Sequence, residues 1–263
     1  MKIWYENTRP VEDPETKPFF NRLRKNFKRV CREGTEVDIK CPEVGTKEFR
    51  HVMQGYPYYQ FLRDIEMVEG LRQAQEEGYD AGIIGCYEDP GLNVLRAIVD
   101  IPIVGVGEAS LIIGQAYGVV GLVYLPMAGM VKGRPIFSTQ QRGAMKVDTV
   151  TRVFNLSPEE IQEYDANEPS RIVEDFIKVG RQLINDGAKA LVSAVTMLAA
   201  TITSEGVTEV DRVPVIDCTI TAAKLAELLV GLKEAGLWKS RKTISDEVIS
   251  GLRNVYYYGK KSR

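Results

Sequence analysis

Two stretches of the chain repeat the same order of apolar and polar segments, and this repetition constrains the fold more than any other feature. The first runs GYDAGIIGCYEDPG and later VDIPIVGVGEAS, and the second runs GAKALVSAVTMLAA and later VDRVPVIDCTIT. Each begins with a glycine followed by an apolar run. Each later contains a second apolar run that includes a proline and ends at polar residues. Apolar runs that alternate with helical segments are typical of parallel sheets. The sequence therefore predicts an α/β fold with two pseudo-symmetric lobes, each a parallel sheet flanked by helices.

Periodicity places the individual elements along the chain. Apolar runs predict strands at Lys2–Tyr5, Val37–Lys40, Ala81–Ile84, Ile101–Val106, Gly118–Tyr124, Met145–Phe154, Ala190–Val195 and Val213–Ile216. Helical spacing predicts helices at Phe19–Glu33, Tyr56–Glu77, Leu92–Val99, Ala109–Ala116, Arg171–Asp186 and Ala222–Ala235. Ser157 followed by Pro158 and two glutamates predicts one more helix start.

The order of these elements divides the chain into two lobes. We expect lobe 1 at residues 1–113 together with 219–263, and lobe 2 at residues 114–218. Open α/β sheets bind their ligands at the carboxyl ends of their strands. The polar residues at these ends therefore predict an active site in the cleft between the lobes.

Composition excludes several classes of function. The chain has 34 Lys+Arg and 36 Asp+Glu, for a net charge of -2, so we expect neither a nucleic-acid partner nor a membrane surface. No signal-peptide pattern is visible, and no apolar run approaches the ~18 residues of a membrane span. The four cysteines form no CxxC pair, which indicates reduced thiols and a cytoplasmic protein.

His51 is the single histidine, and this limits the chemistry. It lies in a polar stretch with no loop signature and is expected at the surface, so a Cys-His or Ser-His-Asp mechanism is disfavoured. A zinc site is disfavoured because the chain has few nitrogen and sulfur ligands at useful spacing. We therefore expect no metal and no cofactor. Acid–base chemistry must come mainly from Cys, Asp, Glu, Tyr or Lys.

Cys86 is the candidate catalytic residue because it follows the predicted strand Ala81–Ile84. Gly85 lets the backbone turn there, and the sequence Asp89-Pro90-Gly91 closes the loop before the next helix. A thiol at such a junction can act in catalysis. The alternative is a small buried side chain without chemistry, since free cysteines are among the most buried residues.

Other polar residues at strand ends are candidates for substrate binding. Asn7 offers a short hydrogen-bonding side chain, and Glu108 either orients a ligand or caps the following helix. Tyr124 either donates a phenolic hydrogen bond or packs as an aromatic ring. The backbone N–H groups of Tyr87, Glu88 and Thr196 are candidate donors to a developing negative charge. Residues 127–142 are rich in glycine, proline and basic residues, which fits either a lid or a subunit contact.

The segments GCYEDPGLNVLRAI and IPIVGVGEAS resemble the aspartate/glutamate/hydantoin racemase superfamily, in particular its hydantoin racemase branch. IWYENT, DGAKALVSAVTM and VPVIDC resemble further parts of the same branch. The resemblance implies a cofactor-independent homo-oligomeric enzyme that acts on a small carboxylate or hydantoin-like substrate. It also implies two facing cysteines: one thiolate removes the proton α to a carbonyl, and the other thiol delivers a proton from the opposite face.

The chain departs from this pattern at the second cysteine. The alignment of DGAKALVSAVTM places Val195 there, and valine cannot transfer a proton. Thr196 matches a threonine of the glutamate racemase branch and is a candidate to bind a substrate oxygen. Cys218 follows the next strand, where it either lines the cleft, packs beneath it or replaces the missing thiol.

Three hypotheses follow. In the first, the protein is a racemase or isomerase that acts at the carbon α to a carbonyl, with Cys86 as the proton-transfer thiol. In the second, Cys86 alone serves a lyase or hydrolase that decarboxylates, opens or desulfurates a hydantoin-like compound. In the third, the protein binds a small molecule without catalysis.

Overall fold

The first half of the chain forms a four-stranded parallel sheet in the order β2-β1-β3-β4. Its strands are β1 (Lys2–Glu6), β2 (Glu36–Lys40), β3 (Ala81–Ile84) and β4 (Ile103–Gly105). The structure is a computed structural model that describes residues 1–9, 11, 14–41, 57–125 and 147–255. His51 and residues 127–142 lie outside the described residues.

The second half forms a five-stranded sheet in the order β6-β5-β7-β9-β8. The parallel strands are β5 (Val120–Tyr124), β6 (Thr149–Val153), β7 (Ala190–Ser193) and β9 (Val213–Ile216). The short β8 (Glu209–Val210) pairs antiparallel with β9 through a turn in which Asp211 and Arg212 have φ of 48° and 69°. The sequence prediction missed this hairpin, because two residues are too few for a periodic signal.

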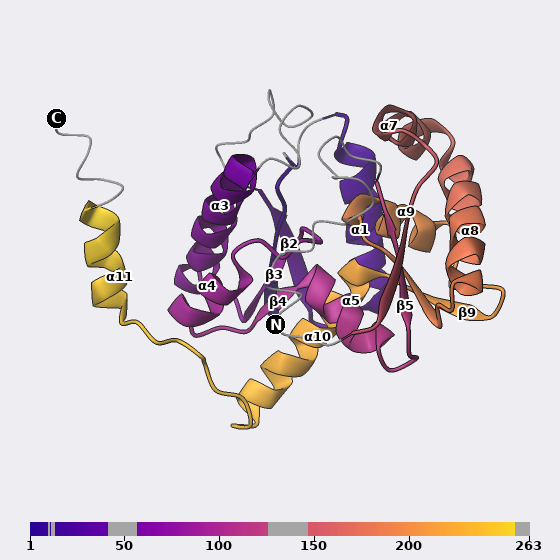
Figure 1. Cartoon of the computed structure of the whole chain (residues 1–263). Coiled ribbons are helices and arrows are strands. Elements are labelled where there is room, and N and C mark those ends of the chain that lie inside the picture. Colours follow the sequence, from indigo (N-terminus) through magenta and orange to yellow (C-terminus); the bar gives the residue numbers. More distant parts are fainter. Residues whose placement is uncertain (10, 12–13, 42–56, 126–146, 256–263) are drawn as a thin grey trace.

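Helices cover both faces of each sheet (Figure 1). The outer face of the first sheet carries α3 (Pro57–Glu76) and α4 (Leu92–Ile98), and that of the second sheet carries α8 (Pro169–Asn185), on which α7 (Pro158–Asn167) packs. Between the sheets lie α1 (Lys17–Val30), α5 (Val106–Gly114), α9 (Thr196–Ser204) and α10 (Cys218–Glu234). The predicted α/β fold with two sheets is confirmed. The exact lobe boundaries stay a prediction, although α10 packs on β3 and β4 as that division implies.

The apolar core has two parts that meet at the first sheet. Ile3 and Tyr5 of β1 face the large cluster between the sheets, whereas Trp4 faces a smaller cluster under α3 and α4 that includes Met67 and Leu71. This division follows from the alternation of side chains along a strand. Each fully buried large apolar side chain stabilises the fold by about 1.5–3 kcal/mol.

Helices α5, α9 and α10 begin directly at the ends of strands, and this corrects the assignment of the strand ends. Helix α5 begins at Val106, α9 at Thr196 and α10 at Cys218, where exposed polar tips were expected. Carboxylates that accept the first helical N–H groups explain two of these starts. Asp217 accepts from the N–H of Thr219 at 2.7 Å and so begins α10 directly after β9.

The predicted helix start at Ser157 is confirmed. The Ser157 hydroxyl accepts from the Glu160 N–H at 3.2 Å, and the Glu160 carboxylate accepts from the Ser157 N–H at 2.8 Å. This reciprocal pair satisfies two N–H groups that would otherwise have no partner in the first turn.

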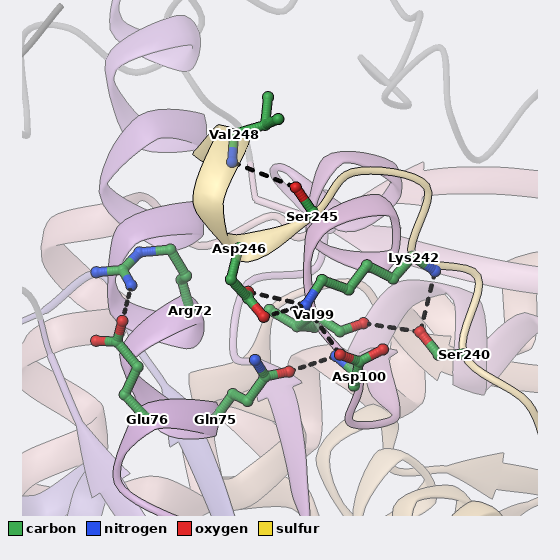
Figure 2. Close-up of polar contacts among 10 residues, drawn as sticks. All are labelled: Arg72, Gln75, Glu76, Val99, Asp100, Ser240, Lys242, Ser245, Asp246 and Val248. Carbon is green, nitrogen blue, oxygen red and sulfur yellow. Dashed lines mark hydrogen bonds and ion pairs between the residues drawn. The ribbon is translucent and has the colours of Figure 1, made fainter. Parts of the chain in front are cut away.

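The last described helix, α11 (Asp246–Arg253), attaches to the first lobe through polar contacts (Figure 2). Lys242 Nζ lies 2.9 Å from the Asp100 carboxylate and 2.8 Å from that of Asp246, and Ser240 donates to the Val99 carbonyl at 3.1 Å. No residue of α11 is buried. Among the described residues, no helix is long and apolar enough to cross a membrane.

Candidate functional site

Cys86 lies at the carboxyl end of β3, half-buried, in a turn that the neighbouring strand fixes. The Gly85 N–H donates to the Glu6 carbonyl at 2.7 Å, and the buried Asn7 side chain donates to the Gly85 carbonyl at 3.2 Å. A side chain at position 85 would collide with the Tyr5 ring and with the Glu6 carbonyl oxygen. Glycine is therefore required for this approach of β1 to the turn, and Asn7 supports the Cys86 backbone.

Arg63 of α3 contacts the Cys86 sulfur through its guanidinium group. The same guanidinium lies 3.3 Å from the Glu88 carboxylate. Arg63 itself is only 8% exposed. The sequence prediction missed this residue, because the spacing of a helix does not show which distant loop its side chains reach. The thiol is therefore held from the α3 side of the first sheet.

Burial and charge act in opposite directions on the Cys86 thiol. Burial raises its pKa, and the positive charge of Arg63 lowers it. The negative charges of Glu88 and Asp89 raise the pKa further, while a hydrogen bond from the backbone of Glu88 lowers it. Burial also raises the pKa of Glu88, again with Arg63 opposing the shift. Arg63 is thus the charged side chain that favours the thiolate.

Asp89 ties the Cys86 loop to the start of α5. Its fully buried carboxylate accepts from the N–H groups of Gly107 at 3.0 Å and Glu108 at 2.7 Å. A side chain at Gly105 would collide with this carboxylate. Asp89 also has a φ of 50°, an unusual value for a residue other than glycine. The sequence indicated only a turn here, whereas the structure makes Asp89 the cap of α5.

Glu108 pairs with Arg96 rather than capping its own helix. Arg96 Nη1 donates to Glu108 Oε1 at 2.9 Å, and the same guanidinium donates to the Ile103 carbonyl at 3.0 Å. The half-buried carboxylate is therefore engaged in holding α4, β4 and α5 together. Its predicted role in orienting a ligand stays a prediction.

Tyr87 and Tyr124 bring the two lobes together. Their rings meet edge to face, with centroids 6.0 Å apart, and both side chains are buried. Ser110 donates to the Tyr87 hydroxyl oxygen at 3.3 Å, and burial raises the pKa of Tyr87. Aromatic packing, one of the two alternatives for Tyr124, is what the structure shows.

The end of β7 is the place in the second lobe that corresponds to Cys86 in the first. Val195 is the residue before α9, and Thr196 is the first helical residue; both are half-buried. The Ser193 hydroxyl donates to the Val195 carbonyl at 3.3 Å. Arg9, from the loop after β1, reaches this end of the second lobe and lies 4.0 Å from the Met197 sulfur.

Cys218 is fully buried at the first position of α10. Burial raises the pKa of its thiol well above the ordinary value, and the charges of Asp217 and Asp89 act in the same direction. The thiol is therefore protonated at neutral pH. This location corresponds to packing beneath the site, one of the alternatives that the sequence left open.

Glu6 is a buried carboxyl group one residue beyond the predicted strand Lys2–Tyr5. It is the last residue of β1, 1% exposed, and accepts from the Trp4 indole N–H. A side chain at Gly70 of α3 would lie 2.6 Å from its carboxylate. Burial raises the pKa of Glu6 to about 7, against hydrogen bonding from Trp4 and the charge of Lys40.

Within the described parts of the chain, no group of three or more His, Cys, Asp or Glu residues is placed to hold a metal ion. The described polar groups near Cys86 are a guanidinium, carboxyl groups and backbone amides. Such groups support proton transfer and the binding of a small polar molecule.

The two-lobe α/β fold is that of solved racemases. Allantoin racemase from Klebsiella pneumoniae superposes with a TM-score of 0.71 and 21% identity, covering 94% of this chain and 95% of that one. Allantoin racemase from Pseudomonas fluorescens superposes with a TM-score of 0.65 and 18% identity, covering 94% and 98%. These likenesses establish the fold.

Sequence comparisons confirm the resemblance to the aspartate/glutamate/hydantoin racemase superfamily. Residues 53–124 match the family model described as Asp/Glu/Hydantoin racemase. The chain is also 25% identical to the hydantoin racemase of Pseudomonas sp. (strain NS671) over 238 residues, covering 86% of this chain and 88% of that relative. The region that matches the family model, residues 53–124, includes Cys86, Asp89 and Glu108. The comparisons support an isomerase of the racemase type.

Proposed function

We propose that this protein is a cofactor-independent racemase or isomerase that acts at the carbon α to a carbonyl. Its substrate is a small hydantoin-like or amino-acid-like molecule, and Cys86 is the proton-transfer thiol. The observation that carries the proposal is the half-buried Cys86 sulfur at the end of β3, in contact with the Arg63 guanidinium. A positive neighbour favours the thiolate, which is the form able to take a proton.

The reaction places two demands on the site. An α-proton is weakly acidic, so the negative charge that develops on the carbonyl oxygen needs fixed donors. We assign this role to the backbone N–H groups of Tyr87 and Glu88 in the Cys86 loop. The backbone N–H and the hydroxyl of Thr196, at the start of α9, are the donors from the second lobe. Asn7 supports the loop through its bond to the Gly85 carbonyl.

The second proton has a different source in this chain. Val195 has no exchangeable proton on its side chain, and Cys218 is fully buried. We therefore propose that solvent water delivers the second proton, in place of the facing cysteine that the family resemblance implies. Cys86 then works as a single thiol between a thiol and a thiolate state.

A panel of single enantiomers tests the proposal. We would incubate the protein with 5-substituted hydantoins, allantoin, aspartate and glutamate, and follow both enantiomers by chiral chromatography. The wild type should racemise members of one substrate class, and Cys86→Ala should not. Cys31→Ala is the matched control, because Cys31 is another half-buried free thiol and lies at the end of α1.

Three results would contradict the proposal. Ring opening or release of carbon dioxide without racemisation would favour the single-cysteine hydrolase or lyase. Full racemase activity in Cys86→Ala would exclude Cys86 as the proton-transfer group. Binding without turnover, unchanged in Cys86→Ala, would identify a small-molecule binding protein.

A further inference from the structure

Helix α3 carries the Arg63 guanidinium, which lies at the carboxyl end of β3, where Cys86 is found. Arg63, Met67 and Leu71 follow one another at intervals of one helical turn and share the face that packs on the sheet. Met67 and Leu71 are fully buried against the strands, whereas Arg63 lies nearer the start of the helix. The packing of α3 therefore fixes where the Arg63 side chain can reach.

Two partners of Arg63 come from a single short loop. Its guanidinium contacts the Cys86 sulfur through Nη2 and lies 3.3 Å from Glu88 Oε2 through Nη1. A guanidinium presents several N–H donors in a rigid plane and can hold two acceptors at once. Asp89 anchors the other end of the loop on α5. The thiol thus has a fixed position relative to one positive and one negative side chain.

Among the described residues, four charged or titratable groups act on the Cys86 thiol. Arg63 approaches from α3, Glu88 and Asp89 from the loop itself, and Tyr5 from β1. Arg63 is the cation of this set, and its guanidinium contacts both Cys86 and Glu88. Neutralising Glu88 would leave more of the guanidinium charge for the thiol.

We propose that Arg63 is a positioning residue that holds the Cys86 sulfur as a thiolate, and that Glu88 opposes it by sharing the same guanidinium. The inference rests on the proposed function for its biological meaning, since a proton-transfer thiol must ionise. The arrangement itself is testable without any substrate. Two substitutions should move the ionisation of Cys86 in opposite directions.

The test measures the alkylation of Cys86 by iodoacetamide as a function of pH, with peptide mass spectrometry to follow each cysteine. Arg63→Met should shift the rate curve of Cys86 to higher pH and slow alkylation at pH 7.5 about tenfold or more, because only the thiolate reacts. Glu88→Gln should shift the curve to lower pH. Arg63→Lys should stay close to the wild type, because it keeps the charge.

Two internal references separate ionisation from access. Cys31 in the same sample should keep its curve, since Glu227 and Lys224 are the charged groups that act on it. Arg72→Met, on the same helix but paired with Glu76, should leave Cys86 unchanged. The plateau rate at high pH reports the exposure of the thiol, and the midpoint reports its ionisation.

The proposal is overturned if folded Arg63→Met shows the wild-type midpoint, or if Glu88→Gln leaves the midpoint unchanged or moves it upward. If Arg63→Met fails to fold, Glu88→Gln decides the matter: a lower midpoint supports the proposal, and an unchanged or higher midpoint overturns it. A failure here would leave the racemisation panel unaffected. Conversely, a silent panel would not alter the alkylation curves.

Discussion

The ends of β3 and β7 occupy equivalent places in the two lobes but carry different chemistry. Both strands lie inside their sheets, β3 between β1 and β4, and β7 between β5 and β9. At the end of β3, the Cys86 thiol meets Arg63 and lies two residues before Glu88. At the end of β7, Val195 and Thr196 lead into α9 with no ionisable side chain. The duplicated architecture therefore holds one strand end with a thiol and one strand end whose own residues carry no thiol or other ionisable group.

The caps of the neighbouring helices reinforce this contrast. In the second lobe, Asp217 begins α10 with its own side chain, two residues before the N–H that it accepts. In the first lobe, α5 is capped by Asp89, which belongs to the Cys86 loop. The turn after β7 therefore supplies no cap to α10, although the Thr203 hydroxyl of α9 donates to the Asp217 carboxylate at 2.6 Å. Capping from a distance ties the Cys86 loop to β4 and α5.

The first prediction has the largest effect and compares the two strand ends directly. Cys86→Ala should lower kcat by about 10²–10⁴, the usual contribution of a positioned acid or base. Thr196→Val should lower it by about tenfold or less, since it removes one hydrogen bond of about 1 kcal/mol. Steady-state kinetics on the best substrate of the panel measures both. Equal losses of kcat in the two variants would show that the two strand ends contribute equally to catalysis.

The second prediction concerns the pH dependence of stability, which we place in the first lobe. The pKa of Glu6 is raised to about 7 in the folded state, so folding favours its protonated form. Its stabilising contribution is complete below the unfolded pKa of about 4.3 and is lost as the pH rises through 7. We expect a loss of about 3–4 kcal/mol from this group over that range.

Urea unfolding of Glu6→Gln across pH 4.5–8 checks the pH prediction. The variant should have a flatter stability profile than the wild type and should be more stable at pH 8. Glu160→Gln is the matched control in the second lobe, where hydrogen bonds from Ser157 lower the carboxyl pKa. An unchanged profile in Glu6→Gln would place the pH sensitivity elsewhere.

The third prediction separates the two caps. Asp89→Ala leaves the N–H groups of Gly107 and Glu108 without their acceptor and should cost about 1–3 kcal/mol of unfolding free energy. It should also lower activity, because the Cys86 loop loses its anchor. Asp217→Ala should cost about 0.5–2 kcal/mol and leave kcat within a few fold. Activity losses of the same size in both variants would contradict the distinction.

Sequence patterns predicted much of the fold, because strands, glycine turns and the Ser157 cap are local features. They also singled out Cys86 from its place between a buried strand and a helix. They did not predict Arg63, Asp89 or the burial of Glu6, because each of these depends on a partner far along the chain. Arg63 reads as an ordinary charged residue of a helix until the packing of α3 shows which loop it meets.

The fourth prediction tests whether Val195 is the reason for the contrast. Val195→Cys would place a thiol at the start of α9, where a helix N-terminus favours a thiolate. It should raise the rate of inversion relative to that of α-proton exchange, by supplying a second proton-transfer group. Ala at the same position is the control for the change in size. No difference between the two variants would mean that the end of β7 does not reach the substrate.

The most direct measurement is the fate of solvent deuterium during turnover of one enantiomer in deuterium oxide. We would separate the two enantiomers early in the reaction and measure α-deuterium in each by mass spectrometry. A single-thiol mechanism predicts deuterium in the recovered starting enantiomer as well as in the product, and Val195→Cys should shift the label toward the product. Product that keeps its α-protium would contradict the account, because the second proton would then not come from solvent water.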